Sequence, residues 1–263
     1  MSAPTPLLAA HALAIGYDRT PIAAGIDLAL HAGSVTCLLG PNGIGKTTLF
    51  KTLLGLLPSI GGTVTASGRD LSGLSRPEAA RLMAYVPQAY AGDFAYTVLD
   101  LVLMGRTAHL GAFAAPRAAD AEIAMAALAT LGIAGLAQRD ALRISGGQRQ
   151  LALIARALAQ EARIIVMDEP TASLDLGNRA LVLGRIRALA DQGFAVLVST
   201  HEPEQAFAVA DQVAILESGG CTCGPTADLL TSERLSALYG TDVRVETTPS
   251  GRRVVILAAL NGN

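Results

Sequence analysis

Several residue types are scarce in this chain of 263 residues, and each scarcity argues against a kind of structure or site. Tryptophan is absent, and three cysteines, Cys37, Cys221 and Cys223, are too few for a disulfide framework. Cys221 and Cys223 stand one residue apart, but two thiolates with no histidine nearby make a poor metal site, so we expect a structural or incidental role. No apolar run reaches the roughly 18 residues that a membrane helix needs; the longest candidate, residues 123–137, is too short and rich in alanine.

Charge is sparse as well. Charged residues make up 16% of the chain, the net charge is −2 and no run of like charges occurs, so we expect no nucleic-acid partner. Residues 1–6 lack the basic start of a secretory signal, which favours the cytoplasm as the compartment. Lysine occurs only as Lys46 and Lys51, so the position of each is informative. The hydrophobic fraction of 51% is typical of a folded α/β protein, long enough for one large domain or for a core and a subdomain.

One of the two lysines lies in a glycine-rich loop. Residues 40–48 match the pattern G-x-x-x-x-G-K-[ST] without a mismatch; they follow the strand-like run Val35–Leu39 and open a helix expected from Thr48 to Leu57. Glycines let backbone N–H groups converge on a phosphate, and the helix N-terminus adds its dipole. The Lys46 ammonium can reach the β- and γ-phosphates of a nucleotide, and the Thr47 hydroxyl can ligate Mg²⁺. The candidate nucleotide-binding residues of this loop are Gly40, Pro41, Asn42, Gly43, Ile44, Gly45, Lys46, Thr47 and Thr48.

The pattern of apolar runs predicts an α/β fold. Residues 7–17, 22–31 and 62–67 are predicted to be strands of an antiparallel flank. Four short apolar runs without clean alternation are typical of parallel strands that are buried on both faces: residues 35–39, 83–86, 164–167 and 195–199. Each run is followed by turn residues and a helix-like segment, which predicts a parallel sheet with helices on both sides.

Two further segments are predicted as additions to this core. Residues 95–142 are rich in alanine and leucine at helical spacing, with a capping box at Thr97 and Asp100 that opens a helix through Met104. A second helix is predicted there for residues 117–131, and the tail predicts a hairpin from two apolar runs around residues 249–251. The predicted organisation is a core with its antiparallel flank in residues 1–94 and 143–240, an inserted helical subdomain in residues 95–142, and a hairpin-like extension in residues 241–263.

Two acids follow the predicted strand at residues 164–167. In open α/β sheets ligands lie beyond the carboxyl ends of the strands, and adjacent acids there are costly unless they meet a cation or move a proton. Asp168 fits a role in holding Mg²⁺ through water, and Glu169 is then placed to polarise a water that attacks the γ-phosphate. Two solvated acids at a strand end are the plain alternative, which the phosphate loop in the same chain disfavours.

A glycine pair precedes a predicted amphipathic helix. Ser145 and Gln148 fit a simple capping box, but capping does not explain Gly146 and Gly147, which cost helix propensity. Close approach of the backbone to an anion would compensate for that cost. We therefore interpret Gly146 and Gly147 as candidates for contact with an anion.

The order of these motifs resembles that of the ATP-binding subunits of ABC transporters over nearly the whole chain. The signature-like segment Ile144–Gln148 is the most discriminating, because phosphate loops alone occur in many nucleotidases. The other segments resemble the family's motifs in the expected order: Tyr17 as the ring that stacks on adenine, residues 40–47 as Walker A, Gln88 as the Q-loop glutamine, Asp168 and Glu169 as Walker B and the catalytic glutamate, residues 173–175 as the D-loop and His201 as the switch histidine.

The resemblance implies a RecA-like phosphate-loop core that binds ATP and Mg²⁺ and hydrolyses ATP. Two copies would pack head to tail, with each ATP between the phosphate loop of one copy and the signature of the other. Separate transmembrane permease subunits would receive the motion at the cytoplasmic face of the inner membrane, where this chain would be peripheral, and a periplasmic or lipoprotein substrate-binding protein would act through the permease. The roles implied are catalysis by Lys46, Gln88, Glu169 and His201, and metal contacts from Thr47, Gln88 and Asp168. The resemblance also implies nucleotide contacts from Ser145, Gly146, Gly147, Gln148 and Asp175.

Two further matches concern the cargo. Residues 97–106, after Gln88, and Gly177-Asn178, after the D-loop segment, resemble the ATPases of importers for ferric siderophores, haem and cobalamin. The main hypothesis is therefore the ATPase subunit of a bacterial importer for an iron chelate, haem or a cobalamin-like complex. Alternatives are another cargo such as molybdate or other metal species, or an exporter. A soluble ABC ATPase that acts on ribosomes or DNA is the remote alternative, and the intact Glu169 and His201 argue against a binding module without catalysis.

Overall fold

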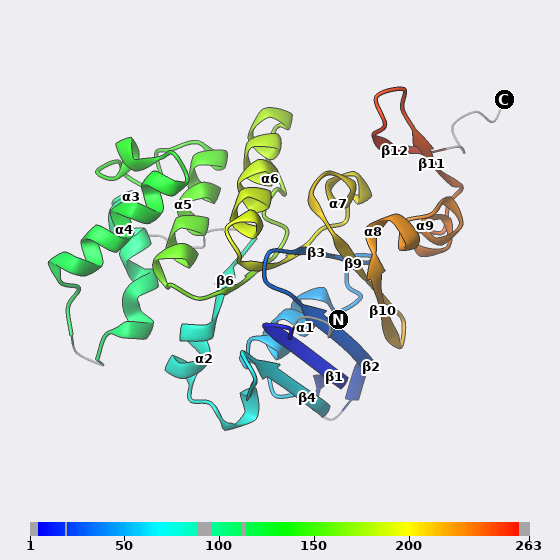
Figure 1. Ribbon diagram of the computed structural model, residues 1–263, viewed down its shortest axis with the longest axis horizontal. Helices are drawn as coiled ribbons and strands as arrows, with labels where there is room; N and C mark the ends of the chain where they lie inside the picture. The colour runs from blue at the N-terminus through cyan, green and yellow to red at the C-terminus, as the bar shows by residue number, and fades with distance from the viewer. Residues whose placement is uncertain (1–4, 19, 89–95, 112–113, 258–263) are drawn as a thin grey trace.

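The computed structural model describes residues 5–18, 20–88, 96–111 and 114–257. Figure 1 shows a central sheet between a group of helices and an antiparallel sheet, with a small hairpin near the C-terminal end. The α/β fold with a mostly parallel central sheet and an antiparallel flank is confirmed.

Six strands form the central sheet in the order β10-β9-β3-β8-β7-β6. Neighbours are parallel, except that β10 pairs antiparallel with β9. The strands are β3 (Val35–Leu39), β6 (Met83–Val86), β7 (Ile164–Met167), β8 (Ala195–Ser199), β9 (Gln212–Glu217) and β10 (Gly220–Pro225). The four predicted parallel strands are confirmed with their bounds. Strands β9 and β10 were not predicted from the sequence; β9 contains a similar apolar run, whereas β10 has glycines and a proline and depends on its pairing with β9.

Alternate residues of the central strands enter two hydrophobic cores. On β3, Cys37 and Leu39 enter the core that includes most of the helices, whereas Leu38 enters the core on the opposite face, with α1 (Lys46–Leu53) and the antiparallel sheet. Because both faces are covered, the strands show no alternation in sequence. The first core includes residues of α5 (Gly146–Ala159), α6 (Leu176–Asp191) and α7 (Pro203–Val209), and the second includes residues of α1.

The antiparallel sheet has the strand order β2-β1-β4-β5. Its strands are β1 (Leu8–Tyr17), β2 (Thr20–Leu30), β4 (Gly61–Ala66) and β5 (Arg69–Asp70), followed by η1 (Leu71–Gly73) and α2 (Arg76–Leu82). The three predicted strands are confirmed to within two residues at each end. This sheet packs over α1 and so supports the loop that precedes α1.

The helix predicted for Thr48–Leu57 was wrong at both ends, because α1 covers Lys46–Leu53. It begins earlier because Gly45, at φ +111, already turns the chain into the helix. It ends earlier because Gly55 takes a left-handed conformation at φ +70 and the N–H groups of Leu56 and Leu57 both donate to the Lys51 carbonyl.

The described part of residues 95–142 is helical. The Thr97–Asp100 capping box is confirmed: the Asp100 N–H donates to Thr97 Oγ1 at 3.1 Å, and the Thr97 N–H donates to Asp100 Oδ2 at 3.1 Å. Arg106 is buried and donates to Asp120 and to the Ala159 carbonyl, which ties this segment to α5. The elements are α3 (Val98–Leu103), η2 (Met104–His109), α4 (Ala118–Thr130) and η3 (Ala134–Leu136).

The C-terminal part contains α8 (Thr226–Leu229), α9 (Ser232–Tyr239), β11 (Val243–Thr247) and β12 (Arg253–Leu257). The predicted hairpin is confirmed, since β11 and β12 pair antiparallel. The three-part organisation stays a prediction; its boundary between residues 94 and 95 involves residue 94, which lies outside the described residues, as do both ends of the chain at residues 1–4 and 258–263.

Candidate functional site

The glycine-rich loop joins β3 to α1 at the carboxyl edge of the central sheet. A cavity of about 420 Å³ lies against it, lined by Asn42, Gly43, Gly45, Lys46, Thr47, Thr48, Gln88, Asp168 and Glu169. At Gly45 the left-handed backbone favours glycine, and a Cβ atom would also lie 3.0 Å from the Ile22 side chain. The structure thus brings most of the phosphate-loop residues, Gln88 and both predicted acids together around one cavity, whereas Gly40, Pro41 and Ile44 do not line it.

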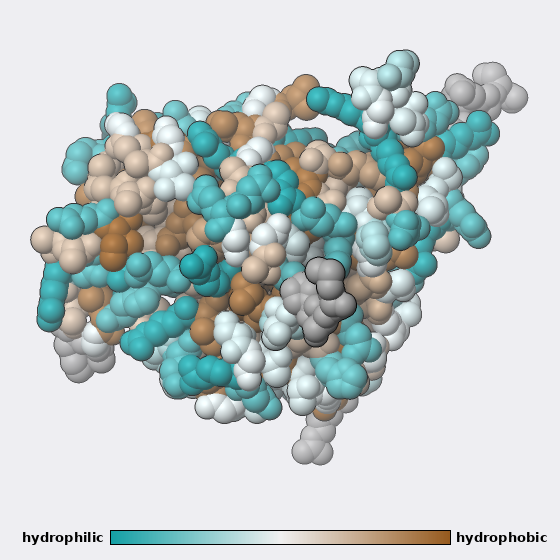
Figure 2. Space-filling view, in the orientation of Figure 1, coloured by the Kyte–Doolittle hydropathy of each residue, from teal (hydrophilic) through white to brown (hydrophobic). Residues whose placement is uncertain are grey.

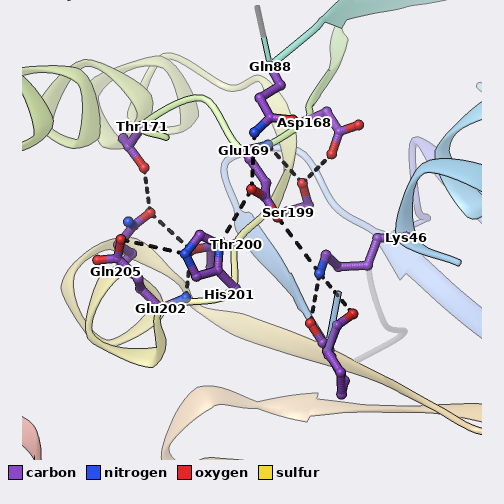
Figure 3. A network of polar contacts seen from close by, with 12 residues as sticks. Lys46, Gln88, Asp168, Glu169, Thr171, Ser199, Thr200, His201, Glu202 and Gln205 are labelled. Atoms are coloured by element: carbon purple, nitrogen blue, oxygen red, sulfur yellow. Dashed lines mark hydrogen bonds and ion pairs between the residues drawn. The ribbon is translucent and has the colours of Figure 1, made fainter. Parts of the chain in front are cut away.

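Lys46 lies at one side of the polar network, within reach of Glu169 (Figure 3). Its ammonium donates to the carbonyls of Gly40 at 2.7 Å and Pro41 at 3.2 Å, and lies 3.8 Å from Glu169 Oε1. Only 7% of the side chain is exposed. Burial lowers the pKa of Lys46, and the negative charges of Glu169 and Asp168 oppose that shift. The arrangement places a shielded cation where an anion can approach from the cavity.

Asp168 is held by three hydroxyl groups. Ser199 Oγ donates to Asp168 Oδ1 at 2.6 Å, while Thr47 Oγ1 donates to Oδ2 at 3.1 Å and the Tyr85 hydroxyl donates to Oδ2 at 3.4 Å. Burial, together with the charge of Asp168, raises the pKa of Tyr85 to about 12, so this phenol remains a donor at neutral pH. The Thr47 hydroxyl and the Asp168 carboxylate are adjacent oxygen donors of the kind that suits Mg²⁺, so these residues fit the ion that the sequence implies.

Glu169 reaches the cavity from a strained backbone. Its φ of +42° lies in the left-handed region, which non-glycine residues rarely adopt and which is frequent at functional sites. Its N–H donates to Ser199 Oγ at 2.8 Å. Its Oε2 atom accepts from Gln88 Nε2 at 3.4 Å and lies 3.4 Å from His201 Nδ1. The three residues predicted from distant parts of the sequence therefore meet at one carboxylate (Figure 3).

The signature-like segment lies elsewhere. Ser145 caps α5, with the Gln148 N–H donating to Ser145 Oγ at 3.2 Å and the Ser145 N–H donating to Gln148 Oε1 at 3.1 Å, so the predicted capping box is confirmed. Asp175 caps α6 in the same way through the N–H of Asn178, which lowers the pKa of Asp175. None of the residues 145–148, nor Asp175, lines the cavity at the phosphate loop.

Packing explains why residue 147 is a glycine, which the sequence does not show. A Cβ atom at Gly147 would lie 2.2 Å from Asn178 Oδ1, whereas at Gly146 it would meet only Leu174 at 3.5 Å, an ordinary contact. The close packing of α5 on α6 therefore accounts for Gly147, and the anion interpretation is needed only for Gly146.

Tyr17 stands at the end of β1 beside the phosphate-loop helix. Its hydroxyl lies 3.4 Å from Thr48 Oγ1, and 49% of the residue is exposed. The ring is thus accessible next to the loop, as a stacking role requires.

Several polar residues of the site were not predicted. Ser199 contacts both acids, and its signal was available: it is the last residue of a predicted parallel strand, and the neighbouring strand ends at Met167, directly before Asp168. Gln205 accepts from Thr171 Oγ1 at 2.7 Å and from Thr200 Oγ1 at 3.1 Å, which fastens the loop that carries His201. No sequence pattern indicated Gln205, because its partners are distant in the chain or belong to a different element.

The protein-family model described as ABC transporter matches residues 23–172. The chain belongs to the ABC transporter family. It is an ATP-binding subunit of this family, and so an ATP-hydrolysing transport ATPase that binds nucleotide and works as part of a membrane transporter. No helix within the described ranges has the length and apolarity to cross a membrane.

Curated relatives cover almost the whole of this ABC ATPase. A hemin import ATP-binding protein from Streptomyces coelicolor is 39% identical over 95% of this chain and 89% of its own. A molybdate import ATP-binding protein from Haemophilus influenzae is 41% identical over 81% of this chain and 80% of its own. A solved inward-facing ABC transporter described as of metal-chelate type is 35% identical, with a TM-score of 0.85 over 97% of this chain and 99% of its own. The predicted phosphate-loop fold is confirmed by this structural match.

Proposed function

We propose that this ABC ATPase energises uptake of an iron chelate, haem or a cobalamin-like metal complex across the inner membrane. The observation that carries the proposal is the similarity over at least 95% of the chain to a protein named for hemin import and to a transporter described as of metal-chelate type. The resemblance of residues 97–106 and of Gly177-Asn178 to importers of this group supports the same cargo class.

Molybdate is the second candidate cargo. It is favoured by the 41% identity to a protein named for molybdate import. The ATPase is not expected to touch either cargo, so the two candidates differ in the permease and not in the chemistry of this chain.

The geometry supports a division of roles for hydrolysis. Lys46 binds the β- and γ-phosphates, and Thr47 and Asp168 hold Mg²⁺, which neutralises phosphate charge when bound. Glu169 orients and polarises the attacking water. Gln88 and His201 position Glu169, since both contact its Oε2 atom, and Gln88, which lines the cavity, would also contact the metal ion. Tyr17 stacks on the adenine ring.

A complete site requires a second copy of the chain. The segment 145–148 and Asp175 lie outside the cavity that the phosphate loop lines, so one chain carries both halves of a site that it does not close. A head-to-tail pair with two-fold symmetry brings each signature segment to the phosphate loop of the other copy. Gly146 then approaches the γ-phosphate with its N–H at the N-terminus of α5.

A groove on the same chain suits a permease. A cavity of about 380 Å³ lies between the α1–α2 region and the helices η2 and α5, lined by the apolar residues Leu54, Leu56, Met83 and Met104, among others. Figure 2 shows apolar residues gathered in the hollow between these two parts of the surface. The proposed occupant is a cytoplasmic loop of separate permease subunits, which places this chain peripherally on the cytoplasmic face of the inner membrane. A periplasmic or lipoprotein substrate-binding protein acts through the same permease.

The test uses Glu169→Gln, which removes the base and keeps the shape of the side chain. We expect ATP binding to persist while turnover falls at least about a hundredfold, the range of a general base. Near-normal hydrolysis would refute the role of Glu169. The same variant, tagged and purified from gently solubilised native membranes with ATP, is expected to bring a polytopic permease with it.

Uptake assays in cells that lack the permease then distinguish haem, ferric siderophore, cobalamin and molybdate. Loss of uptake of one of the first three supports the main proposal, whereas loss of molybdate uptake alone supports the second candidate. Recovery of the variant only with ribosomes or nucleic acid would refute transport.

A further inference from the structure

The C-terminal part of the chain reaches the loop that carries His201. Tyr239, the last residue of α9, donates a hydrogen bond from its hydroxyl to the main-chain carbonyl of His201 at 3.1 Å. The side chain of His201 makes the second contact: its Nδ1 atom lies 3.4 Å from Glu169 Oε2. A residue near the end of the chain is therefore one residue away from the carboxylate at the centre of the site.

The Tyr239 hydroxyl is a dependable donor. Burial, with the nearby charge of Glu204, raises the pKa of Tyr239 to about 12, so the phenol keeps its proton at neutral pH. The carbonyl of His201 can only accept, which fixes the direction of the bond.

The position of Tyr239 is itself held by the hairpin that follows. Leu235 of α9 is fully buried, and Gly240 at φ +65 ends the helix directly after Tyr239. Ser236 Oγ donates to the Val243 carbonyl at 3.1 Å and accepts from the Val243 N–H at 2.9 Å. The start of β11 is thereby joined to the turn of α9 that presents Tyr239.

The hairpin also holds α7, the helix that begins two residues after His201. The Arg253 guanidinium of β12 lies over the Phe207 ring, 5.9 Å from its centroid, and donates to the Ala227 carbonyl at 2.9 Å. This cation–π contact fastens the far end of the segment that carries His201. Residues 232–257 therefore contact the segment from His201 to α7 at two points, the His201 carbonyl and the Phe207 ring.

We propose that Tyr239 is a positioning residue, through which the C-terminal segment 232–257 holds the His201 loop where the imidazole contacts Glu169. The proposal rests on the proposed function, in which Glu169 polarises water and His201 positions it. Without the Tyr239 bond, the loop populates arrangements in which the imidazole no longer meets the carboxylate. ATP binding, which depends on the phosphate loop, is unaffected.

The test is Tyr239→Phe in the full chain, which deletes one hydroxyl and keeps the ring. Loss of one hydrogen bond is expected to lower kcat for ATP about three- to tenfold, with KM unchanged. The control is Thr130→Val, which deletes a hydroxyl bond within α4, from Thr130 Oγ1 to the Ala126 carbonyl, and is expected to leave kcat unchanged.

A second measurement, the NMR signal of the His201 ring, reports the position of the loop independently of ATPase activity. The chain has four histidines, so the ring resonance of His201 can be assigned by comparison with His201→Gln. In Tyr239→Phe we expect this resonance to shift or broaden, while those of His11, His31 and His109 stay in place.

The outcomes separate this proposal from the proposed function. An unmoved His201 resonance would overturn the proposal, and so would a moved resonance with kcat unchanged. If Glu169→Gln hydrolyses ATP normally, the assigned roles fail on their own account, and the resonance still reports whether Tyr239 holds the loop.

Discussion

A single residue, Ser199, makes a different hydrogen bond to each of the two neighbouring acids. Its hydroxyl donates to Asp168 and accepts from the N–H of Glu169, and the residue is fully buried at the end of β8. The first bond holds Oδ1 of the Asp168 carboxylate in place. The second helps to hold the left-handed backbone at Glu169, a conformation that persists only when its surroundings enforce it. Ser199 thus supports both a proposed metal-binding acid and the proposed base without entering the cavity lining.

Ser199→Ala is expected to reduce both stability and turnover. Removing the hydroxyl leaves buried groups of two residues without a partner, a loss of about 1–3 kcal/mol in the free energy of unfolding. We expect kcat to fall as well, because Glu169 is no longer held. Urea unfolding and steady-state ATPase assays measure the two effects. Ser72→Ala, at an exposed serine that bonds Asp70, is the control; equal effects from both variants would contradict the special role of Ser199.

At the scale of elements, the N-terminus of α5 is packed against α6. Asn178 fills the space in front of Gly147 and also donates to Asp175 Oδ2 at 2.7 Å, so the signature segment and the D-loop segment are fitted to each other by one side chain. Displacement of either helix end would therefore disturb the other.

This packing predicts opposite stability effects for two adjacent glycines. Gly147→Ala places a Cβ atom against Asn178 and is expected to lower the free energy of unfolding by about 1–3 kcal/mol. Gly146→Ala meets open surroundings and is expected to be neutral or slightly stabilising, even though it lowers ATPase activity in the proposed dimer. Adding Asn178→Ala to Gly147→Ala is expected to restore part of the loss in urea unfolding. No rescue would mean that another contact opposes the methyl group.

The cap of α2 predicts a dependence of stability on pH. The hydroxyl and N–H of Ser75, with Arg69, lower the pKa of Glu78 from its usual 4.5 to about 2. A carboxylate whose pKa is depressed in the folded state stabilises the fold fully above about pH 4.5, and this contribution is lost as pH falls towards 2. Glu78→Gln is therefore expected to lose less stability than the parent protein between pH 7 and pH 3.

Chemical unfolding at the two pH values measures this difference. Glu122→Gln, at an exposed position of α4, removes the same charge elsewhere and serves as the control. If the parent and Glu78→Gln proteins lose equal stability on acidification, the cap does not titrate as described.

In the molecule as a whole, the proposed groove and the nucleotide cavity are lined by different residues. Tyr85 connects them, because it lines the groove and its hydroxyl donates to Asp168 in the nucleotide site. A permease loop in the groove would therefore contact a residue that touches the site. This gives a short physical route between partner and nucleotide.

A charge placed in the groove is expected to weaken binding of the permease without changing ATP hydrolysis by the isolated chain. Leu56 lines the groove beside other apolar residues, although the lining also includes Arg76 and Arg156, and Leu56 is 57% exposed, so Leu56→Glu adds a charge without disturbing the core. We expect association with the permease to weaken at least about tenfold, because a carboxylate would be buried on docking, while the basal ATPase rate of the isolated chain is unchanged. Co-purification and ATPase assays measure both. Met125→Glu on α4, outside the groove, is the control, and equal loss in both variants would contradict this docking site.

Local features of this protein could be predicted from its amino-acid sequence. Residues 40–48, the acids at 168 and 169, the cap at Ser145 and the four buried strands were all predictable, because each depends on residues that are adjacent in the chain. Spacing within a loop and apolar content within a strand carry their own physical reasons.

Contacts between distant residues could be identified only in the folded protein. The contact of Gln88 and His201 with one oxygen of Glu169, the support from Ser199, the reason for Gly147 and the bond from Tyr239 to the His201 carbonyl all join separate elements. β10 has no strand signal of its own and forms by pairing with β9. These features depend on packing and hydrogen bonding between segments far apart in the chain, and the residues of one segment do not reveal its partner.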